Sequence, residues 1–529
     1  MMQFKSFVIG FVLCVLISLS SLYSSMRMGV LAWPTLFVSL ICFVFLARMG
    51  KSDMRQVTLA HTLASSGSMV AGAIAYTLPG FWIASNGGQD IALWQVLAVS
   101  FVGVFLGVIC TSIYKRMLVD KENLDYPIGQ ATYLTLREAC EKGGSRRILF
   151  VPAAISAFFT IIRDWCGWIR PIYLLAGENR AKGIPSLSFW PSLMAMSIGA
   201  LLTPKVVLLL FASAFGFQYL IFPLLSGAGG SPALFSDAEF LQRNIAIGLI
   251  LGSGCGIFLK SIYVKLRNPA MRGFGFGSEL ADRRALVIRL GVFLACAACY
   301  LLSTGLNAFS SVVLCLAILA STYLSARLTG ESGINPMEVF AYISFIVIAV
   351  IQKLNMLQGF LIMISVTVAC GLTGDIMNDF KSGVGFGVDG KRQSLAELVG
   401  ALVGVAIAVF AVFHLRSRGA DFGGEGSEFI VPQAKLMGRF LQDTISGTTS
   451  MVFVISLLAS VAVSFLGVNA AIIGLGIYLP FYITLSISLG QVVSLCVPKK
   501  RKESVPLIAS GLLTGEGIVS MIISFFSLG

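Results

Sequence analysis

Long stretches without a single charged residue are the feature that most restricts how this chain can fold. Leu290–Ala326 and Thr444–Pro498 contain no Asp, Glu, Lys or Arg. A helix needs roughly 20 apolar residues to cross a bilayer, so each of these stretches is long enough for at least two crossings. The pattern predicts an all-α polytopic membrane protein.

The composition agrees with this fold class, since 57% of the 529 residues are hydrophobic and only 12% are charged. We expect one integral membrane domain over residues 1–529, with about 14 to 16 transmembrane or re-entrant helices, some of them broken. Two structural halves, about 1–265 and 285–529, would be joined by a basic loop near 260–289. The expected apolar spans lie near residues 7–25, 29–48, 57–83, 91–114, 147–167, 188–200, 203–225, 242–265, 285–304, 308–326, 335–352, 357–373, 394–415, 448–466, 468–495 and 505–526.

The formal net charge of +13 is explained by basic connections between spans. Cytoplasmic loops of membrane proteins are enriched in Lys and Arg. Lys260–Arg289 and Lys499–Lys502 are such clusters, and the cations between Arg48 and Arg55 predict a cytoplasmic N-terminus. We therefore expect a multi-pass protein of the inner (plasma) membrane with no nucleic-acid partner. The charge rule becomes ambiguous for the topology after residue 390.

An acidic segment, "GLTGDIMNDFKSGVGFG" at Gly371–Gly387, follows one of the apolar spans. If the helix continues through it, Asp375 and Asp379 lie four residues apart on one face, where like charges repel. Lys381 does not relieve this repulsion, because residues two apart point to different faces. Two interpretations stay open: the acids are solvated at a cytoplasmic helix end, or they hold a cation, a substrate ammonium group or a shared proton in a cavity.

A polar stripe follows Pro127, which suits the first position of a helix. Its members recur at helical spacing and are Tyr126, Gln130, Tyr133, Arg137 and Glu141. The stripe fits either an interfacial helix in a cytoplasmic loop or a re-entrant half-helix that faces the substrate.

Two segments share the pattern Thr-Gly-Glu-(Ser)-Gly-Ile, namely Leu328–Met337 and Leu513–Met521. Such a recurrence can mark a structural duplication with paired broken helices. Their acids, Glu331 and Glu516, need partners or protons inside a bilayer. Asn335 in the first segment is a further candidate for the transport path.

A fourth group surrounds Pro480, which interrupts an apolar span at Gly476–Gly490. Tyr478 and Tyr482 flank this proline and supply aromatic rings with hydroxyl groups. The segment reads either as a kinked structural helix or as part of the transport path.

Several kinds of chemistry lack their motifs. His61 and His414 stand alone without an H-E-x-x-H pattern, and no G-x-x-x-x-G-K-[ST] loop is present. Cys296 and Cys299 form a C-x-x-C pair in mid-span without a second pair of ligands. We therefore expect no enzyme, no catalytic residues, no cofactor and no resident metal ion.

Three of these segments together resemble the oligopeptide transporter superfamily. "GDIMNDFKSG", "YPIGQAT" and "SGLLTGEGI" occur in that family's order and span most of the chain. The matched residues are Asp375, Met377, Asp379, Phe380, Lys381, Gly383, Tyr126, Pro127, Gly129, Ala131, Ser510, Gly511, Leu512, Gly515 and Glu516.

The resemblance implies a proton-coupled secondary transporter that imports small peptides or peptide-like metal chelates of the iron–siderophore type. The Asn-Pro-Gly and Lys-Glu-His motifs of the eukaryotic branch are missing, so the chain is closer to the yellow-stripe-like and prokaryotic branch. A membrane channel or another solute or ion carrier is the alternative. Expected partners are the substrate, protons and the lipid bilayer, and a homodimer is compatible with the sequence. The residues that we expect to bind substrate or couple transport are Asp375, Asn378, Asp379, Lys381, Glu331, Asn335, Glu516, Tyr126, Gln130, Tyr478 and Tyr482.

Overall fold

A computed structural model describes most of the chain between residues 4 and 527. The residues outside the description are most of 29–53, then 86–89, 142–144, 171, 178–186, 227–239, parts of 243–258, 261–282, 334, 424–430 apart from 429, 446–450, 499–501 and 503. The expected span at 29–48 and the basic loop near 260–289 fall for the most part in these gaps.

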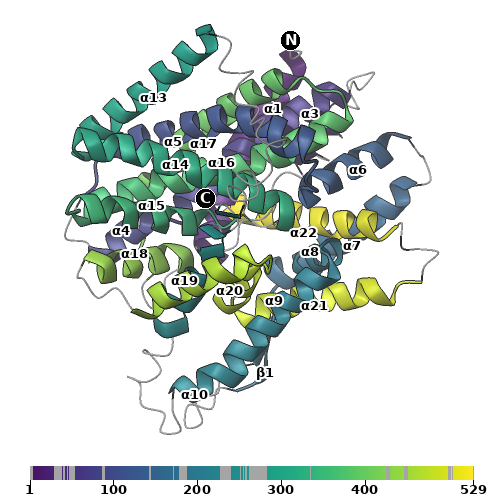
Figure 1. Ribbon diagram of the computed structural model, residues 1–529. Coiled ribbons are helices and arrows are strands. Elements are labelled where there is room, and N and C mark those ends of the chain that lie inside the picture. The colour runs from purple at the N-terminus through teal and green to yellow at the C-terminus, as the bar shows by residue number, and fades with distance from the viewer. Residues whose placement is uncertain are drawn as a thin grey trace. The chain divides into compact units, whose positions relative to one another are not determined.

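The described residues are almost entirely helical (Figure 1). They form two compact units. Unit 1 comprises Met1–Glu141, Phe274–Thr448 and Ser520–Gly529, and unit 2 comprises Lys142–Gly273 and Thr449–Val519. Each unit therefore combines segments from early and late parts of the chain. A division into sequential halves near residues 265–285 stays a prediction.

Unit 1 contains the helices that surround the acidic segment. They are α1 (Phe4–Met28), α3 (Met54–Ala75), α4 (Leu78–Ala84), α5 (Leu93–Tyr114), the π-helix η1 (Lys115–Lys121), α6 (Pro127–Glu141), α13 (Arg283–Thr304), α14 (Ala308–Ser332), α15 (Met337–Ile351), α16 (Met356–Gly385), α17 (Gly390–Ser417) and α18 (Pro432–Ile445).

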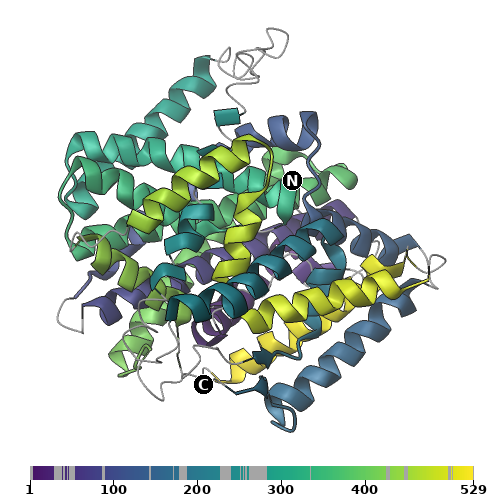
Figure 2. The ribbon, with the colours of Figure 1, turned by 60° about the horizontal axis from the view of Figure 1, so that its bottom comes forward.

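Unit 2 is built from shorter helices and one β-hairpin. Its elements are α7 (Ser145–Thr160), the π-helix η2 (Ile161–Trp165), β1 (Tyr173–Ala176), β2 (Leu187–Phe189), α8 (Leu193–Leu201), α9 (Pro204–Phe215), the π-helix η4 (Gly216–Ile221), α10 (Phe222–Ser226), α19 (Met451–Phe465), α20 (Ala470–Tyr478), α21 (Phe481–Cys496) and most of α22 (Val505–Ser527). The strands are antiparallel, with Tyr173 opposite Phe189. Helix α21 packs on α8 and α9, and α20 packs on α9; the teal and yellow-green helices can be followed in Figure 2.

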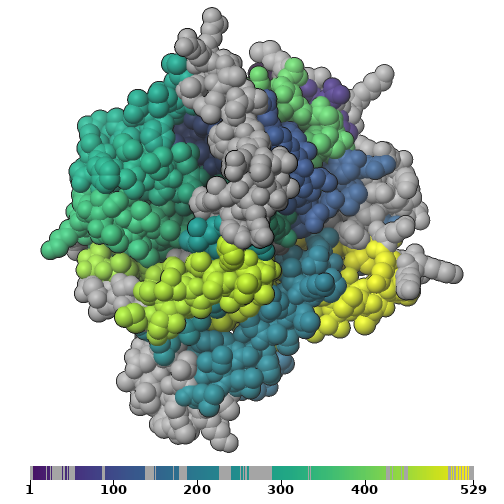
Figure 3. Space-filling model, in the orientation of Figure 1, coloured from purple at the N-terminus to yellow at the C-terminus, as the bar shows by residue number. Residues whose placement is uncertain are grey.

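The prediction of an all-α polytopic membrane protein is confirmed. Among the described residues, seven helices are long and apolar enough to cross a membrane: Phe4–Tyr23, Met54–Ala84, Leu93–Lys121, Pro204–Leu224, Ala308–Glu331, Met356–Gly385 and Gly390–Ser417. Helices α13, α14 and α15 lie side by side on one face of unit 1 (Figure 3) and expose large apolar side chains such as Leu302, Phe309 and Val350. In a bilayer such side chains can face lipid.

Helix α16 is the central helix of unit 1, because α3, α5, α14 and α15 all pack against it. Its most apolar stretch of 18 residues is completely buried. Its first turn is closed by a capping box. The Gln358 backbone N–H donates to Asn355 Oδ1, and the Asn355 backbone N–H donates to Gln358 Oε1. No proline follows within the helix, and it runs on past the expected end at residue 373 to Gly385.

Glycines at helical spacing allow the helices of unit 1 to pack closely. A Cβ atom on Gly103 would lie 2.5 Å from the Ser365 carbonyl oxygen of α16, and one on Gly107 would lie 3.0 Å from that of Ala369. In α17, Gly400 and Gly404 lie against the backbone of α3 in the same way. Small residues at helix interfaces provide such contacts in membranes, as the sequence predicts.

Two sequence expectations on helix breaks have different outcomes. The break at Pro480 is confirmed, because α20 ends at Tyr478 and α21 begins at Phe481. The expectation of paired broken helices at the two Thr-Gly-Glu segments is wrong. Helix α14 ends at the first one, where Gly333 has φ +74° and Pro336 follows, whereas α22 continues through the second one, which has no proline.

Candidate functional site

The acidic pair of α16 lies inside unit 1. Asp375 and Asp379 are on one face of the helix, four residues apart, and their exposed fractions are 1% and 0%. The interpretation of a solvated helix end is therefore wrong. The other interpretation, that the acids hold a cation, a substrate ammonium group or a shared proton in a cavity, stays a prediction.

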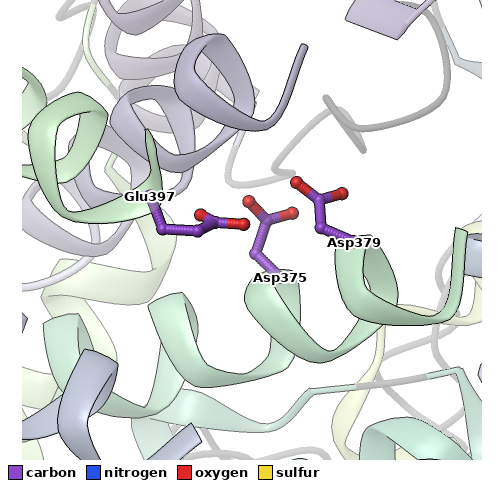
Figure 4. Close-up of side chains that lie close together, drawn as sticks. All are labelled: Asp375, Asp379 and Glu397. Atoms are coloured by element: carbon purple, nitrogen blue, oxygen red, sulfur yellow. The ribbon is translucent and has the colours of Figure 1, made fainter. Parts of the chain in front are cut away.

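A third carboxylate joins the pair from the neighbouring helix. Glu397 of α17 is completely buried, and one carboxylate oxygen from each of Asp375, Asp379 and Glu397 lies within 4.8 Å of the others. The three side chains point toward one another (Figure 4). We call these three residues the carboxylate cluster. Their spacing is one at which carboxylates can share a proton or hold a cation.

Helix α3 supplies polar groups on the third side. The Ser65 hydroxyl donates to Asp379 Oδ2 at 3.2 Å, and His61 Nδ1 lies 3.9 Å from Asp379 Oδ1. From α17, the Gln393 amide donates to the Asp379 backbone carbonyl and to the Thr62 hydroxyl. Because His61 and Ser65 are four residues apart, as are Gln393 and Glu397, each helix presents one polar face to the same interior.

The electrostatics of this interior are unusual for a membrane-spanning region. In the described part of the chain, no Lys or Arg forms an ion pair with Asp379 or Glu397. An ionised carboxylate is costly to bury without a partner. Asp379 and Glu397 therefore require protons or a cation to balance their charge.

Asn378 and Tyr126 fix the start of α6 rather than joining the cluster. The Gly129 backbone N–H donates to Asn378 Oδ1 at 3.1 Å. The Tyr126 N–H donates to the Gly330 carbonyl, and its hydroxyl donates to the Ala326 carbonyl, both at 3.0 Å. Tyr126 lies outside the seven candidate spans, and burial raises the pKa of its phenol, so the hydroxyl stays a donor.

Lys381 points away from the carboxylates, as its spacing predicts. Its ammonium group donates to Asn123 Oδ1 and to the Leu124 carbonyl, both at 2.8 Å. Asn123 has φ +50° and Tyr126 has φ +43°, so this lysine fastens a tightly turned segment between η1 and α6.

Asn335, Glu331 and Gln130 also lie outside the carboxylate cluster. The Asn335 amide donates to the Cys370 carbonyl of α16 and accepts from the Ser325 hydroxyl of α14, both at 2.8 Å. Glu331 is exposed and pairs with Arg327 at 2.9 Å, and Gln130 is exposed on α6.

The remaining predicted residues belong to unit 2. Glu516 is buried and forms an ion pair with Arg163, with 3.0 Å between Oε1 and Nη2. Its carboxylate also accepts from the Ser192 hydroxyl and from the Met194 N–H at the start of α8, both at 2.8 Å. Tyr478 and Tyr482 are half-buried on either side of the Pro480 break.

Sequence reasoning missed Glu397 and set His61 aside as an isolated histidine. Glu397 had a usable signal, because it is an acid inside the apolar span expected at 394–415. His61 had a weaker one, since it lies in a stretch with no Asp, Glu, Lys or Arg. Their meeting with Asp379 depends on the packing of three helices and could not be read from spacing.

Many membrane-spanning helices, close glycine packing and a buried group of carboxylates define a polytopic membrane transporter. The comparison with known proteins agrees: the chain belongs to the OPT oligopeptide transporter protein family, which it matches over residues 2–259 and 278–527. It is also similar to a Haemophilus influenzae protein described as "Putative oligopeptide transporter", with 23% identity over 95% of this chain and 92% of that protein.

Proposed function

We propose that this protein is a secondary transporter that couples proton movement to the import of small peptides or peptide-like metal chelates across the inner membrane. The family supports the transport of peptides. Closeness to the yellow-stripe-like branch, inferred from the missing Asn-Pro-Gly and Lys-Glu-His motifs, supports chelates as a second substrate class. The carboxylate cluster supports coupling to protons, and it is the observation on which the proposal depends.

The physical argument begins with the separation of the carboxylates. Two ionised groups that lie within 4.8 Å of each other repel by at least about 3.5 kcal/mol at an effective dielectric constant of about 20. A proton bound to one of the three removes two of the three pairwise repulsions, and a second proton removes the last one. Proton uptake and release therefore change the free energy of the packed state of α3, α16 and α17 by an amount that can move a conformational equilibrium.

Coupling follows if protonation and substrate binding favour different states of the transporter. The closed packing of the three helices is compatible with a protonated cluster, because buried charge is then reduced. An open state that admits water would favour ionised carboxylates. A proton gradient would thereby drive the cycle in one direction.

The test is uptake by the purified full chain in proteoliposomes. A panel of short peptides and ferric chelates is offered with an acidic outside and with equal pH on both sides. We expect the gradient to drive uptake of at least one class, and Asp379→Asn to abolish this dependence while substrate exchange at equal pH continues. Asp90→Asn, at an exposed acid, is the matched control.

Two results would count against the proposal. Gradient-driven uptake at the wild-type level in Asp379→Asn would remove the carboxylate cluster from coupling. A substrate flux that is independent of the proton gradient, at a rate far above the turnover rate of transporters, would favour a channel.

A further inference from the structure

His61 is an unusual residue for the interior of unit 1. Its side chain is completely buried in α3, and neither ring nitrogen has a hydrogen-bond partner among the described residues. Nearly all buried polar groups in proteins have such a partner, and an exception in a native structure calls for an explanation, such as a catalytic role or a bound water or ion.

The position of the ring points to one neighbour. His61 Nδ1 lies 3.9 Å from Asp379 Oδ1, and this oxygen also has no hydrogen-bond partner in the described structure. The other oxygen of the same carboxylate is occupied by the Ser65 hydroxyl. A movement of about 1 Å would bring Nδ1 and Oδ1 to the distance of a charge-assisted hydrogen bond, about 2.8 Å.

Among the described residues, the charged side chains placed near His61 are carboxylates. Helices α1, α4, α16 and α17 pack against α3. Asp375 and Asp379 come from α16 and Glu397 from α17. In α1, the described titratable side chains are Cys14 and Tyr23, which are buried, and Lys5, which is exposed; the Cys14 thiol donates to a carbonyl of α17, and α4 contains no titratable residue. An imidazolium ion at His61 would therefore have a carboxylate, that of Asp379, as its neighbour.

We propose that His61 is the fourth member of the coupling site and exchanges the transported proton with Asp379. The inference rests on the proposed proton coupling. In one state the proton is on the ring, and the imidazolium N–H donates to Asp379 Oδ1. In the other the N–H bond breaks, its electron pair stays on nitrogen, and an O–H bond forms on the carboxylate.

This arrangement gives the site a proton carrier on a third helix. Asp375 and Asp379 move with α16, and Glu397 moves with α17, whereas the ring belongs to α3. Proton transfer between ring and carboxylate would therefore respond to a change in the packing of α3 against α16. A site confined to one helix would lack this sensitivity.

The chain offers a direct experiment, because it contains only two histidines. His414 is exposed near the end of α17, so His414→Gln leaves His61 as the single imidazole and is itself the matched control. In this variant, labelled with ¹⁵N in the histidine ring and reconstituted in bilayers, magnetic resonance reports whether the ring is neutral or protonated at each pH.

We expect the ring to change from neutral to imidazolium over the pH range in which gradient-driven uptake changes. In Asp379→Asn this change should require more acidic solution, because the carboxylate that stabilises the imidazolium is absent. In His61→Gln, and in His61→Asn as a second variant, substrate exchange at equal pH should continue while the pH profile of driven uptake is lost.

Two outcomes would overturn the inference. One is a ring that stays neutral throughout together with a wild-type pH profile in both His61 variants. The other is a ring signal that changes on addition of EDTA at constant pH, which would show that a metal ion occupies the site. Failure of the proposed function would give a different result: in the wild-type chain, uptake of every substrate would be independent of the proton gradient, whatever the ring signal shows.

Discussion

The ion pair between Arg163 and Glu516 leads to a prediction about the stability of unit 2. Both side chains are buried, and their charged atoms are 3.0 Å apart. Replacement of Arg163 by Met would leave the Glu516 carboxylate buried without a cation. Two donors would still hold it, the Ser192 hydroxyl and the Met194 N–H.

The size of the effect follows from these contacts. Removal of one partner of a buried ion pair costs about 3–5 kcal/mol, and the two remaining donors place Arg163→Met near 3 kcal/mol. Glu516→Gln should cost about 1–2 kcal/mol, because Arg163 keeps Asp164 at 2.7 Å and the Pro191 carbonyl at 2.7 Å. The double variant should cost less than the sum of the two single variants, since it leaves no buried carboxylate without a cation; Asp164, which also loses Arg163, is exposed.

The assay is thermal unfolding in detergent, followed by tryptophan fluorescence. For a unit of 150–250 residues, 1 kcal/mol corresponds to about 2–4 °C, so Arg163→Met should lower the Tm by about 6–12 °C. Asp90→Asn, at an exposed acid, serves as the control. Single variants that melt within about 2 °C of the wild type, or costs that simply add, would refute the reasoning. Because Glu516 is already paired, the pH profile of uptake should survive in Glu516→Gln.

Two further predictions concern unit 1. A Cβ atom on Gly400 would collide with the backbone of α3, so Gly400→Ala should destabilise the protein by about 1–3 kcal/mol. Gly291→Ala is the matched control, because nothing lies within 4 Å of its Cβ position in α13 and the change should stabilise the helix by about 1 kcal/mol; equal melting temperatures would argue against the packing. Lys381→Met should cost about 1–2 kcal/mol through its two lost hydrogen bonds without changing the pH profile of uptake, and Lys353→Met, at an exposed lysine, is its control. A lost pH profile in Lys381→Met would show that this lysine takes part in coupling.

The sequence predicts the fold class because charge-free stretches of this length are typical of helices that cross a membrane. It also predicts local features that depend on a few neighbouring residues, such as the helix break at Pro480 and the close approach at Gly103 and Gly107. The shared face of Asp375 and Asp379 is of the same kind. Each of these follows from the geometry of one helix or from the absence of a side chain.

Features that depend on the residues flanking a motif, or on contacts between distant helices, were harder to predict. The two Thr-Gly-Glu segments look alike, yet one ends a helix and the other does not, because Asn335 and Pro336 follow only the first. The assembly of each unit from separated segments has no local signal at all. Helix α18 was missed because its face pattern is amphipathic rather than uniformly apolar.

The arrangement of the carboxylate cluster on two helices, with His61 on a third, bears on how a proton could be linked to movement. Two acids on α16 alone keep a nearly constant separation, because four residues of one helix form a rigid unit. At equal hydration, their repulsion would then be nearly the same in every state of the transporter and could not by itself favour one helix packing. Glu397 on α17 and His61 on α3 make the electrostatic energy depend on how the three helices pack. Protonation can therefore favour one packing over another, which is the requirement for coupling.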